Sequence, residues 1–159
     1  LVTMRPPSEE AAYHPFENRL FDEALKYAAC QPNTFVVLLP RTPKQRQRFE
    51  ALNLPNLLMP NSVVDGPSLI YYSDLVIGGG GTMNREARVF GTPVYTMFKG
   101  MLGSVDTYLI QSGQMSRIET EADIPRIRLS KKPQTVFSSQ SETGQLLIRE
   151  IVDKILEVR

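Results

Sequence analysis

Short apolar runs alternate along this chain with stretches in which apolar residues recur every three or four positions. The uninterrupted runs lie at residues 1–5, 35–39, 57–59, 75–77 and 93–97. Short apolar runs bounded by proline, glycine or polar residues are typical of strands buried on both faces, so we expect a strand at each. Residues 117–118 and 126–129 predict further short strands or extended segments.

Amphipathic helices are predicted between these runs. The stretch that begins at Phe16 and ends before Pro32 has apolar residues at helical spacing and charged residues on the opposite side. Other helices are expected at residues 44–52, 68–72, 82–90, 105–111 and 145–159. The polar stretch at residues 131–144 has neither the apolar run of a strand nor the three-to-four-residue apolar spacing of a helix, so it is expected to be a loop.

The alternation of strands and helices predicts the fold class. Short connections between alternating elements favour right-handed crossovers, which build a mostly parallel sheet with helices on both faces. We therefore expect an α/β, Rossmann-like three-layer sandwich with about six strands. Residues 1–130 are predicted to form this domain, followed by the loop and the helix at residues 145–159.

Composition narrows the classes of partner. The chain has 159 residues and a net charge of +1, which argues against nucleic acid as an electrostatic partner. Cys30 is the single cysteine, so no disulfide framework is expected and a reducing compartment is indicated. With His14 as the single histidine, neither a metal site nor a cofactor is predicted.

The chain carries no apolar run of membrane-spanning length and no signal-peptide pattern, so we expect a cytoplasmic protein. It opens on the strand-like sequence LVTMR, without an initiating methionine. This start suggests a piece of a longer protein.

Four consecutive glycines, Gly78 to Gly81, join the apolar run at residues 75–77 to the helix expected from Thr82. A strand, a glycine loop and a helix in succession present main-chain amides and the positive end of a helix dipole to an anion. The run has neither the GxGxxG spacing of a dinucleotide fingerprint nor the Gly-Lys-Ser/Thr of a P-loop. It therefore predicts an anion site without defining the ligand.

Other candidates follow neighbouring strands. Arg5 comes after the first strand and Arg41 after the second, while Asp65 precedes the helix before the glycine loop. The carboxyl ends of parallel strands share one edge, so two guanidinium groups and the loop are expected together, as a diphosphate site. The alternative is that both arginines are simply solvated.

Two further residues, Glu86 and His14, have two interpretations each. Glu86, after Asn84, could accept hydrogen bonds from a ribose, or could simply favour the amino end of its helix. His14 is a candidate general acid or base or a phosphate contact, and the alternative is an inert loop residue. A basic group is expected to be a solvated helix face: Arg41, Lys44, Arg46 and Arg48.

The stretches VTMR, FVVLLPR and DGPSLIYYSDLVIGGGGTMNREARVFGTPVY, followed by TYLIQSG, resemble the carboxy-terminal half of GT-B-fold glycosyltransferases and of the related UDP-N-acetylglucosamine 2-epimerases. They are also similar to an uncharacterised prokaryotic family described as glycosyltransferase-like. The likeness covers most of residues 1–118. Its specific part is a glycine loop, four variable residues, Glu-Ala and then Gly-x-Pro, present here as Gly80-Gly81, Glu86-Ala87 and Gly91-Thr92-Pro93.

The resemblance implies one half of a GT-B fold and a nucleoside-diphosphate sugar, in particular a UDP-sugar, as ligand. Residues 61–64 would lie near the base, and Arg5, Arg41 and Asn84 are included in the predicted binding set. The implied phosphate contacts are Gly79, Gly80, Gly81 and Thr82, and the implied ribose contact is Glu86.

The resemblance further implies the donor-binding domain of a metal-independent glycosyltransferase. An amino-terminal Rossmann-like half outside this chain would supply the acceptor site and the catalytic base, so the chain alone is expected to be inactive. The helix at residues 145–159 would pack on the domain or across to that half. The full-length protein could also contact a membrane peripherally.

Two alternatives remain open. The first is half of a UDP-N-acetylglucosamine 2-epimerase-like enzyme. The epimerases carry a histidine-rich arginine motif where this chain has Thr3-Met4-Arg5-Pro6, and a second acid where it has Arg85. These departures count against epimerisation more than against nucleotide binding. The second alternative is a non-catalytic nucleotide-binding or interaction domain.

Overall fold

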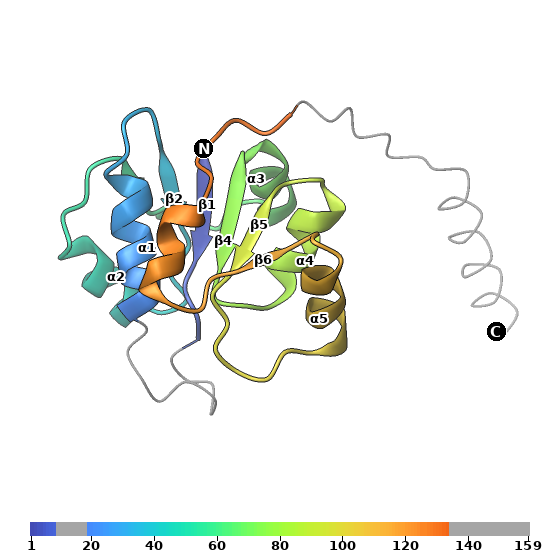
Figure 1. Cartoon of the computed structure of the whole chain (residues 1–159). Coiled ribbons are helices and arrows are strands. Elements are labelled where there is room, and N and C mark those ends of the chain that lie inside the picture. The colour runs from blue at the N-terminus through green and yellow to red at the C-terminus, as the bar shows by residue number, and fades with distance from the viewer. Residues whose placement is uncertain (9–18, 134–159) are drawn as a thin grey trace, which may run out of the picture.

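A single six-stranded sheet forms the centre of the structure, a computed structural model that describes residues 1–8 and 19–133 (Figure 1). All neighbouring strands run parallel, in the order β3-β2-β1-β4-β5-β6. The strands are β1 (Val2–Arg5), β2 (Val36–Leu38), β3 (Leu57–Leu58), β4 (Leu75–Gly78), β5 (Val94–Thr96) and β6 (Ser116–Arg117). The predicted α/β class with a parallel sheet of six strands is confirmed.

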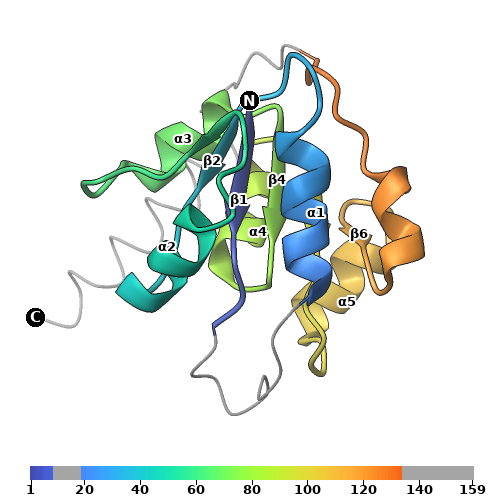
Figure 2. The ribbon, with the colours of Figure 1, turned by 90° about the vertical axis from the view of Figure 1, so that its left-hand side faces the viewer.

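Helices cover both faces of this sheet, as Figures 1 and 2 show. On one face lie α1 (Arg19–Ala29), α2 (Pro43–Glu50) and the 3₁₀ helix η1 (Glu121–Arg126). On the other lie α3 (Gly66–Tyr72), α4 (Thr82–Val89) and α5 (Ser104–Gln111). The result is the expected three-layer sandwich.

Each face has its own hydrophobic core, because successive residues of a strand point to opposite sides. Ile77 joins the core under α1 and η1, whereas Val76 joins the core under α3, α4 and α5. In the first core the rings of Phe21 and Phe49 meet edge to face, with their centroids 6.0 Å apart, which joins α1 to α2. All strand side chains that feed these cores were predicted as apolar runs.

Side-chain caps determine where two of the helices begin. Thr42 Oγ1 accepts a hydrogen bond from the Gln45 main-chain N–H over 3.2 Å at the start of α2. Asp65 Oδ2 accepts one from the Ser68 main-chain N–H over 3.0 Å at the start of α3. These bonds satisfy main-chain donors that have no partner inside the helix. Because Asp65 is the cap, α3 begins at Gly66, two residues before the predicted start.

The segment after β6 differs in part from the prediction. Glu121–Arg126 forms η1, and residues 127–129 have no regular structure, so no strand forms at 126–129. Asp123 Oδ2 accepts hydrogen bonds from the main-chain N–H of Thr120 and from its hydroxyl, both over 3.0 Å. This capping box turns the chain into a helix, and Ile124 and Ile127 are buried below it.

Several predictions lie outside the described residues: His14, residues 16–18 of the first predicted helix, residues 134–144 of the predicted loop and the helix at 145–159. Among residues 1–8 and 19–133, no helix is both long enough and apolar enough to cross a membrane. Over the same ranges, no group of three or more His, Cys, Asp or Glu side chains is arranged to hold a metal ion.

Candidate functional site at the carboxyl edge of the sheet

The end of β1 is joined directly to the glycine loop after β4. Arg5 pairs with Gly78 in the sheet, and the Arg5 carbonyl accepts a hydrogen bond from the Gly79 main-chain N–H over 2.9 Å. Gly79 also touches the residues after β1, because a Cβ placed there would lie 2.4 Å from the main-chain nitrogen of Pro7. Only glycine permits this approach, so the loop and the tail of β1 form one surface.

The same tail is held by the start of α2. The Pro6 carbonyl accepts a hydrogen bond from Arg41 Nε over 3.0 Å, and the Pro7 carbonyl accepts one from Gln45 Nε2 over 2.9 Å. Burial, and then the positive charge of Arg5, lower the pKa of Arg41. The two arginines predicted at this edge therefore lie within electrostatic reach of each other.

The amino end of α4 faces this surface without a carboxylate of its own. Gly81 occupies the cap position and, because it has no side chain, leaves the first main-chain N–H groups of the helix without a side-chain cap. The first turn contains no acidic residue. The exposed Thr82 is the first helical residue. The positive end of the helix dipole is therefore uncompensated within the helix, as an anion site requires.

Gly80 has a φ of 103°, and the ring of Phe98 lies beside it. Phe98 is itself held by two hydrogen bonds. Its main-chain N–H donates to Thr96 Oγ1 over 3.3 Å, and its carbonyl accepts from Arg117 Nη2 over 3.2 Å. The conformation of the loop thus depends on a residue that follows β5.

Asn84 lies under the loop. Its side chain is buried, and Oδ1 has no hydrogen-bond partner in the described structure. A Cβ on Gly78 would lie 2.1 Å from that oxygen, so the Asn84 amide packs against the last residue of β4. The structure places the Asn84 side chain as a support of the loop.

Glu86 is half-buried on α4. It precedes Phe90 by one helical turn, and the Phe90 ring lies 6.3 Å from that of Tyr71 on α3. Residues four apart share a helix face, so Glu86 lies on the side of α4 that faces α3. The structure therefore places Glu86 on the side of α4 that packs toward α3, near the contact of Phe90 with the carboxyl end of α3.

A cavity of about 450 Å³ opens at the ends of β1, β2 and β3 and at the starts of α3 and α4. It joins Arg5 to residues 61–64, which are the residues expected near the base. Its lining consists of Arg5, Leu39, Pro40, Arg46, Pro60, Asn61, Ser62, Val63, Val64, Gly66 and Met83. Of the predicted binding residues only Arg5 lines the cavity, although Met83 belongs to the first turn of α4. The others do not line it: Arg41, Gly79, Gly80, Gly81, Thr82, Asn84 and Glu86.

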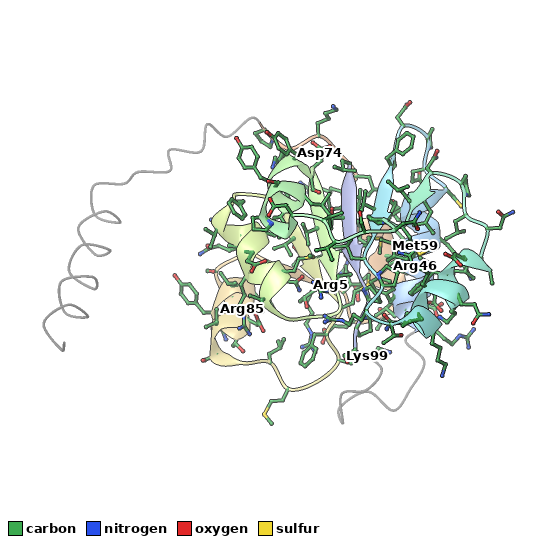
Figure 3. The ribbon with its side chains drawn as sticks, turned by 180° about the vertical axis from the view of Figure 1, so that it is seen from behind. Arg5, Arg46, Met59, Asp74, Arg85 and Lys99 are labelled. Carbon is green, nitrogen blue, oxygen red and sulfur yellow. The ribbon has the colours of Figure 1, made fainter. Side chains whose placement is uncertain are left out.

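Two basic residues at this edge were not predicted as part of the site. Arg46 Nη1 donates to the Met59 carbonyl over 3.4 Å, Arg46 Nη2 donates to the Pro60 carbonyl, and Arg46 lines the cavity. Lys99 lies at the same end of the sheet as Arg5, and Asp74 lies at the other end (Figure 3). The position of Lys99 directly after β5 was the available signal, because β5 is parallel to β1.

The prediction of a solvated basic face at Arg41, Lys44, Arg46 and Arg48 is therefore wrong for its three arginines, since Arg41 donates to the Pro6 carbonyl. Arg46 is bonded to the chain after β3, and Arg48 forms an ion pair with Asp22 on α1. Lys44 is exposed, as predicted. A sequence pattern cannot separate these cases, because each arginine finds its partner in a segment distant along the chain.

A parallel sheet in this order, with a glycine loop, a helix start and two arginines at its carboxyl edge, defines a Rossmann-like α/β domain with the fold of one half of a GT-B protein. The chain belongs to the family described as "Protein of unknown function (DUF354)", whose model matches residues 1–156. The resemblance to a prokaryotic family with a GT-B-like fold is thereby confirmed.

The relatives are longer chains, and the solved ones share the fold. The chain is 38% identical over 80 residues to "Uncharacterized protein MJ0665" of Methanocaldococcus jannaschii, a match that covers 50% of this chain and 23% of that protein. The UDP-GlcNAc 2-epimerase of Methanocaldococcus jannaschii, solved in complex with UDP-GlcNAc and UDP, is 11% identical with a TM-score of 0.59 over 95% of this chain and 44% of that chain. The glycotransferase of kitacinnamycin is 16% identical with a TM-score of 0.53 over 79% of this chain and 31% of that chain.

Proposed function

We propose that this chain is the donor-binding half of a metal-independent glycosyltransferase and that it holds a nucleoside-diphosphate sugar, in particular a UDP-sugar. The observation that carries the proposal is the cavity at the carboxyl edge, which places Arg5 and the first turn of α4 against residues 61–64. A positive side chain, a helix start and an open cavity suit a diphosphate joined to a base. The solved relative that contains UDP-GlcNAc and UDP supports this ligand class.

The diphosphate is assigned to the glycine loop and its arginines. The main-chain N–H of Gly79 already donates to Arg5, so we assign the anion contacts to the amides of Gly80, Gly81 and Thr82. Arg5 supplies charge from inside the cavity. Arg41 is tied to Pro6 and adds positive potential beside Arg5. Asn84 contributes by supporting Gly78.

The nucleoside is assigned to the other side of the cavity. Glu86 faces α3, where its carboxylate would accept hydrogen bonds from both ribose hydroxyls. Residues 61–64 would contact the base, and Val63 is fully exposed there in the free chain. Base and ribose would then lie between the segment after β3 and the first turns of α3 and α4.

The chemical contribution of this half would be electrostatic. When the sugar is transferred, negative charge develops on the departing nucleoside diphosphate. Arg5, the amino end of α4 and Lys99 would stabilise that charge, and fixed donors in such a site contribute strongly to catalysis. The chain has a single histidine and no Asp-x-Asp pair, which favours a transfer mechanism in which these donors stabilise the leaving group without a metal ion.

A second Rossmann-like half completes the enzyme in this proposal. The matches cover 23% of the curated relative, 44% of the solved epimerase and 31% of the solved glycotransferase, so the chain spans only part of each of them. The second half would supply the acceptor site and the catalytic base. The chain alone is expected to bind the donor weakly and to turn nothing over.

Isothermal titration calorimetry with UDP, UMP and uridine tests the assignment. We expect UDP to bind more tightly than uridine, because the loop and arginines recognise phosphate. Glu86→Ala should weaken UDP binding by about tenfold, which corresponds to 1.4 kcal/mol. Glu121→Ala, on the exposed surface of η1, is the matched control and should bind as the wild type does.

A comparison of UDP with 2′-deoxy-UDP isolates the ribose contact. The wild type should prefer UDP, and Glu86→Ala should bind both ligands equally. If the wild type does not discriminate, the ribose assignment fails, even where UDP binds. If the wild type binds none of the nucleotides, the donor-binding proposal fails.

A second candidate, epimerisation of the same donor, is supported by the solved relative named as a UDP-GlcNAc 2-epimerase. One observation weighs against it. Arg85, at the position of the second acid of the epimerases, makes a two-pronged ion pair with Asp106, with both N···O distances at 2.9 Å. With the full-length protein, release of UDP only in the presence of an acceptor indicates transfer. Change of the sugar configuration without acceptor indicates epimerisation.

A further inference from the structure

We propose that a second anion-binding site lies at the β6 edge of the sheet and takes a phosphate or carboxylate group of a small organic molecule. A cavity of about 510 Å³ opens there, which is within the size range of small-molecule sites. Its lining consists of Tyr95, Ile110, Gly113, Met115, Ser116, Arg117, Ile118, Arg126 and Arg128. It shares no residue with the cavity at the carboxyl ends of β1 to β3, so it does not depend on the proposed donor site.

Charge is the first argument. Three arginines line this cavity, and no acidic residue does. Arg117 and Arg126 each have one carboxylate outside the lining, Glu119 at 3.1 Å and Asp123 at 2.9 Å. No ion pair of Arg128 is present within residues 1–8 and 19–133. Three guanidinium groups around one cavity favour an anion between them.

The arginines are held in place by specific hydrogen bonds. The Tyr95 hydroxyl donates to the Arg126 carbonyl over 3.1 Å and accepts from the Arg128 main-chain N–H over 3.2 Å. Ile127, between them, is buried in the core. One side chain of β5 thus fixes the main chain at both arginines, so the cationic segment is already ordered before any ligand binds.

Arg117 provides two donors that lack a partner. Its Nε is buried and has no hydrogen-bond partner in the described structure, although Nη2 donates to the Phe98 carbonyl. A buried N–H without a partner is costly, so the Arg117 side chain is under-satisfied where it lines the cavity, and a rotation that turns Nε toward a bound anion would remove this cost. The main-chain N–H of Ile118 donates inward to Thr96, so that of Arg117 points away from β5, toward the open edge.

The ligand class follows from this combination. Guanidinium groups bind phosphate and carboxylate through paired hydrogen bonds. The side chains of Ile110, Met115 and Ile118 give the same cavity an apolar wall. The site therefore suits an anionic group carried by an organic molecule, and pyrophosphate and citrate are simple probes of the two acid groups, phosphate and carboxylate.

Two-dimensional amide NMR of the 159-residue chain tests the proposal. Titration with pyrophosphate or citrate should shift the amide signals of Ser116, Arg117 and Arg128. A response to one probe identifies the acid type, and a response to both indicates a site for either. Pyrophosphate can also bind the glycine loop, and the signals of residues 80–82 report that event separately.

The variant Arg126→Ala, Arg128→Ala removes two charges from exposed positions that the core does not use. We expect it to weaken the response at Ser116 and Arg117 by at least about tenfold, without changing the response at residues 80–82. The matched control Lys44→Ala, Lys131→Ala removes two exposed charges elsewhere and should bind as the wild type does. The proposal is overturned if neither probe shifts Ser116, Arg117 and Arg128 at millimolar concentration, or if the control weakens binding equally.

Discussion

The ring of Phe98 occupies the space that a side chain on Gly80 would need. A Cβ built on Gly80 would lie 2.7 Å from Phe98 Cδ2, and a Cβ on Gly100 would lie 2.7 Å from Phe98 Cζ. The ring is therefore enclosed by two glycines, one in the loop after β4 and one in the loop after β5. This contact holds the candidate phosphate loop against the rest of the carboxyl edge.

Gly80→Ala should destabilise the loop in two ways, because the added Cβ clashes with Phe98 and because alanine must adopt a φ of 103°. We expect a loss of about 1–3 kcal/mol in the free energy of unfolding. Affinity for UDP should fall with it. Urea denaturation and calorimetry measure the two effects.

Gly103→Ala is the control for this substitution. Gly103 has a φ of −68°, and its nearest neighbour for an added Cβ is Arg85 Nη2 at 3.9 Å. It should unfold and bind UDP nearly as the wild type does. Equal effects of the two substitutions would contradict a specific role for the Gly80–Phe98 contact.

A buried hydroxyl pair links β1 to the end of α3. Ser73 Oγ donates to the Leu69 carbonyl over 2.7 Å, so the hydroxyl of Thr3 must be the donor in its 2.7 Å bond to Ser73. Ser73→Ala leaves the buried Thr3 donor without a partner and should cost about 1–3 kcal/mol of stability. Thr3→Val removes that donor and should cost less.

The double variant Thr3→Val, Ser73→Ala measures the coupling between the two hydroxyls. It should lose less stability than the sum of the two single variants, because no orphaned donor remains. Guanidinium denaturation of the four proteins gives the comparison. Simple additivity would mean that the two hydroxyls are not energetically coupled.

The ion pair between Arg85 and Asp106 joins α4 to α5 on the surface. Both of its N···O distances are 2.9 Å, and the pair raises the pKa of Arg85. Because Arg85 is 44% exposed, we expect a coupling of less than about 1 kcal/mol in a double-mutant cycle with Arg85→Ala and Asp106→Ala. The coupling should shrink as salt is added, and a coupling that salt leaves unchanged would contradict this description.

Asp123 makes the stability of η1 depend on pH. Hydrogen bonds from the Thr120 main-chain N–H, the Thr120 hydroxyl and the Glu119 main-chain N–H hold the pKa of its carboxyl below 3.8. A lowered pKa in the folded state means that the stabilisation is complete above 3.8 and is lost as the pH falls through the folded value. The wild type should therefore exceed Asp123→Asn in stability at neutral pH.

That advantage should decrease in acid, where the carboxyl of the wild type becomes protonated. Thermal unfolding of both proteins between neutral pH and pH 3 measures it. Glu121→Gln, which leaves the three hydrogen bonds of Asp123 intact, is the control. A pH-independent difference between the wild type and Asp123→Asn would show that this carboxyl does not titrate in the expected way.

Most of the sheet could be predicted because five of its six strands are short apolar runs, whereas β6 (Ser116–Arg117) is polar and only residues 117–118 beside it were predicted as a short strand or extended segment. Successive residues of a strand point to opposite faces of the sheet, so a buried sheet has one hydrophobic core on each face. Val76 and Ile77 could therefore be assigned to different cores without knowledge of tertiary contacts. The placement of Arg5 and the glycine loop at one edge was also predictable, since parallel strands share a carboxyl edge. These inferences need only periodicity and topology.

The contacts that hold the candidate site could not be predicted. Gln45 is polar yet buried, because its amide reaches the carbonyl of Pro7, 38 residues away. Arg46 reaches the chain after β3, and Phe98 packs on Gly80 from another loop. Each contact joins segments distant in sequence, so it depends on three-dimensional packing that no local pattern encodes. The 3₁₀ helix at Glu121–Arg126 was missed although Thr120 and Asp123 are a local signal for a helix start.

Asp74 holds two distant points of the chain at the end of the sheet opposite Arg5 (Figure 3). Its Oδ2 lies 2.7 Å from the main-chain nitrogen of Leu1, and its Oδ1 accepts from the Lys132 main-chain N–H over 3.1 Å. One carboxylate therefore fixes the start of β1 relative to the segment after η1, at the end of the sheet that lies away from the carboxyl-edge cavity.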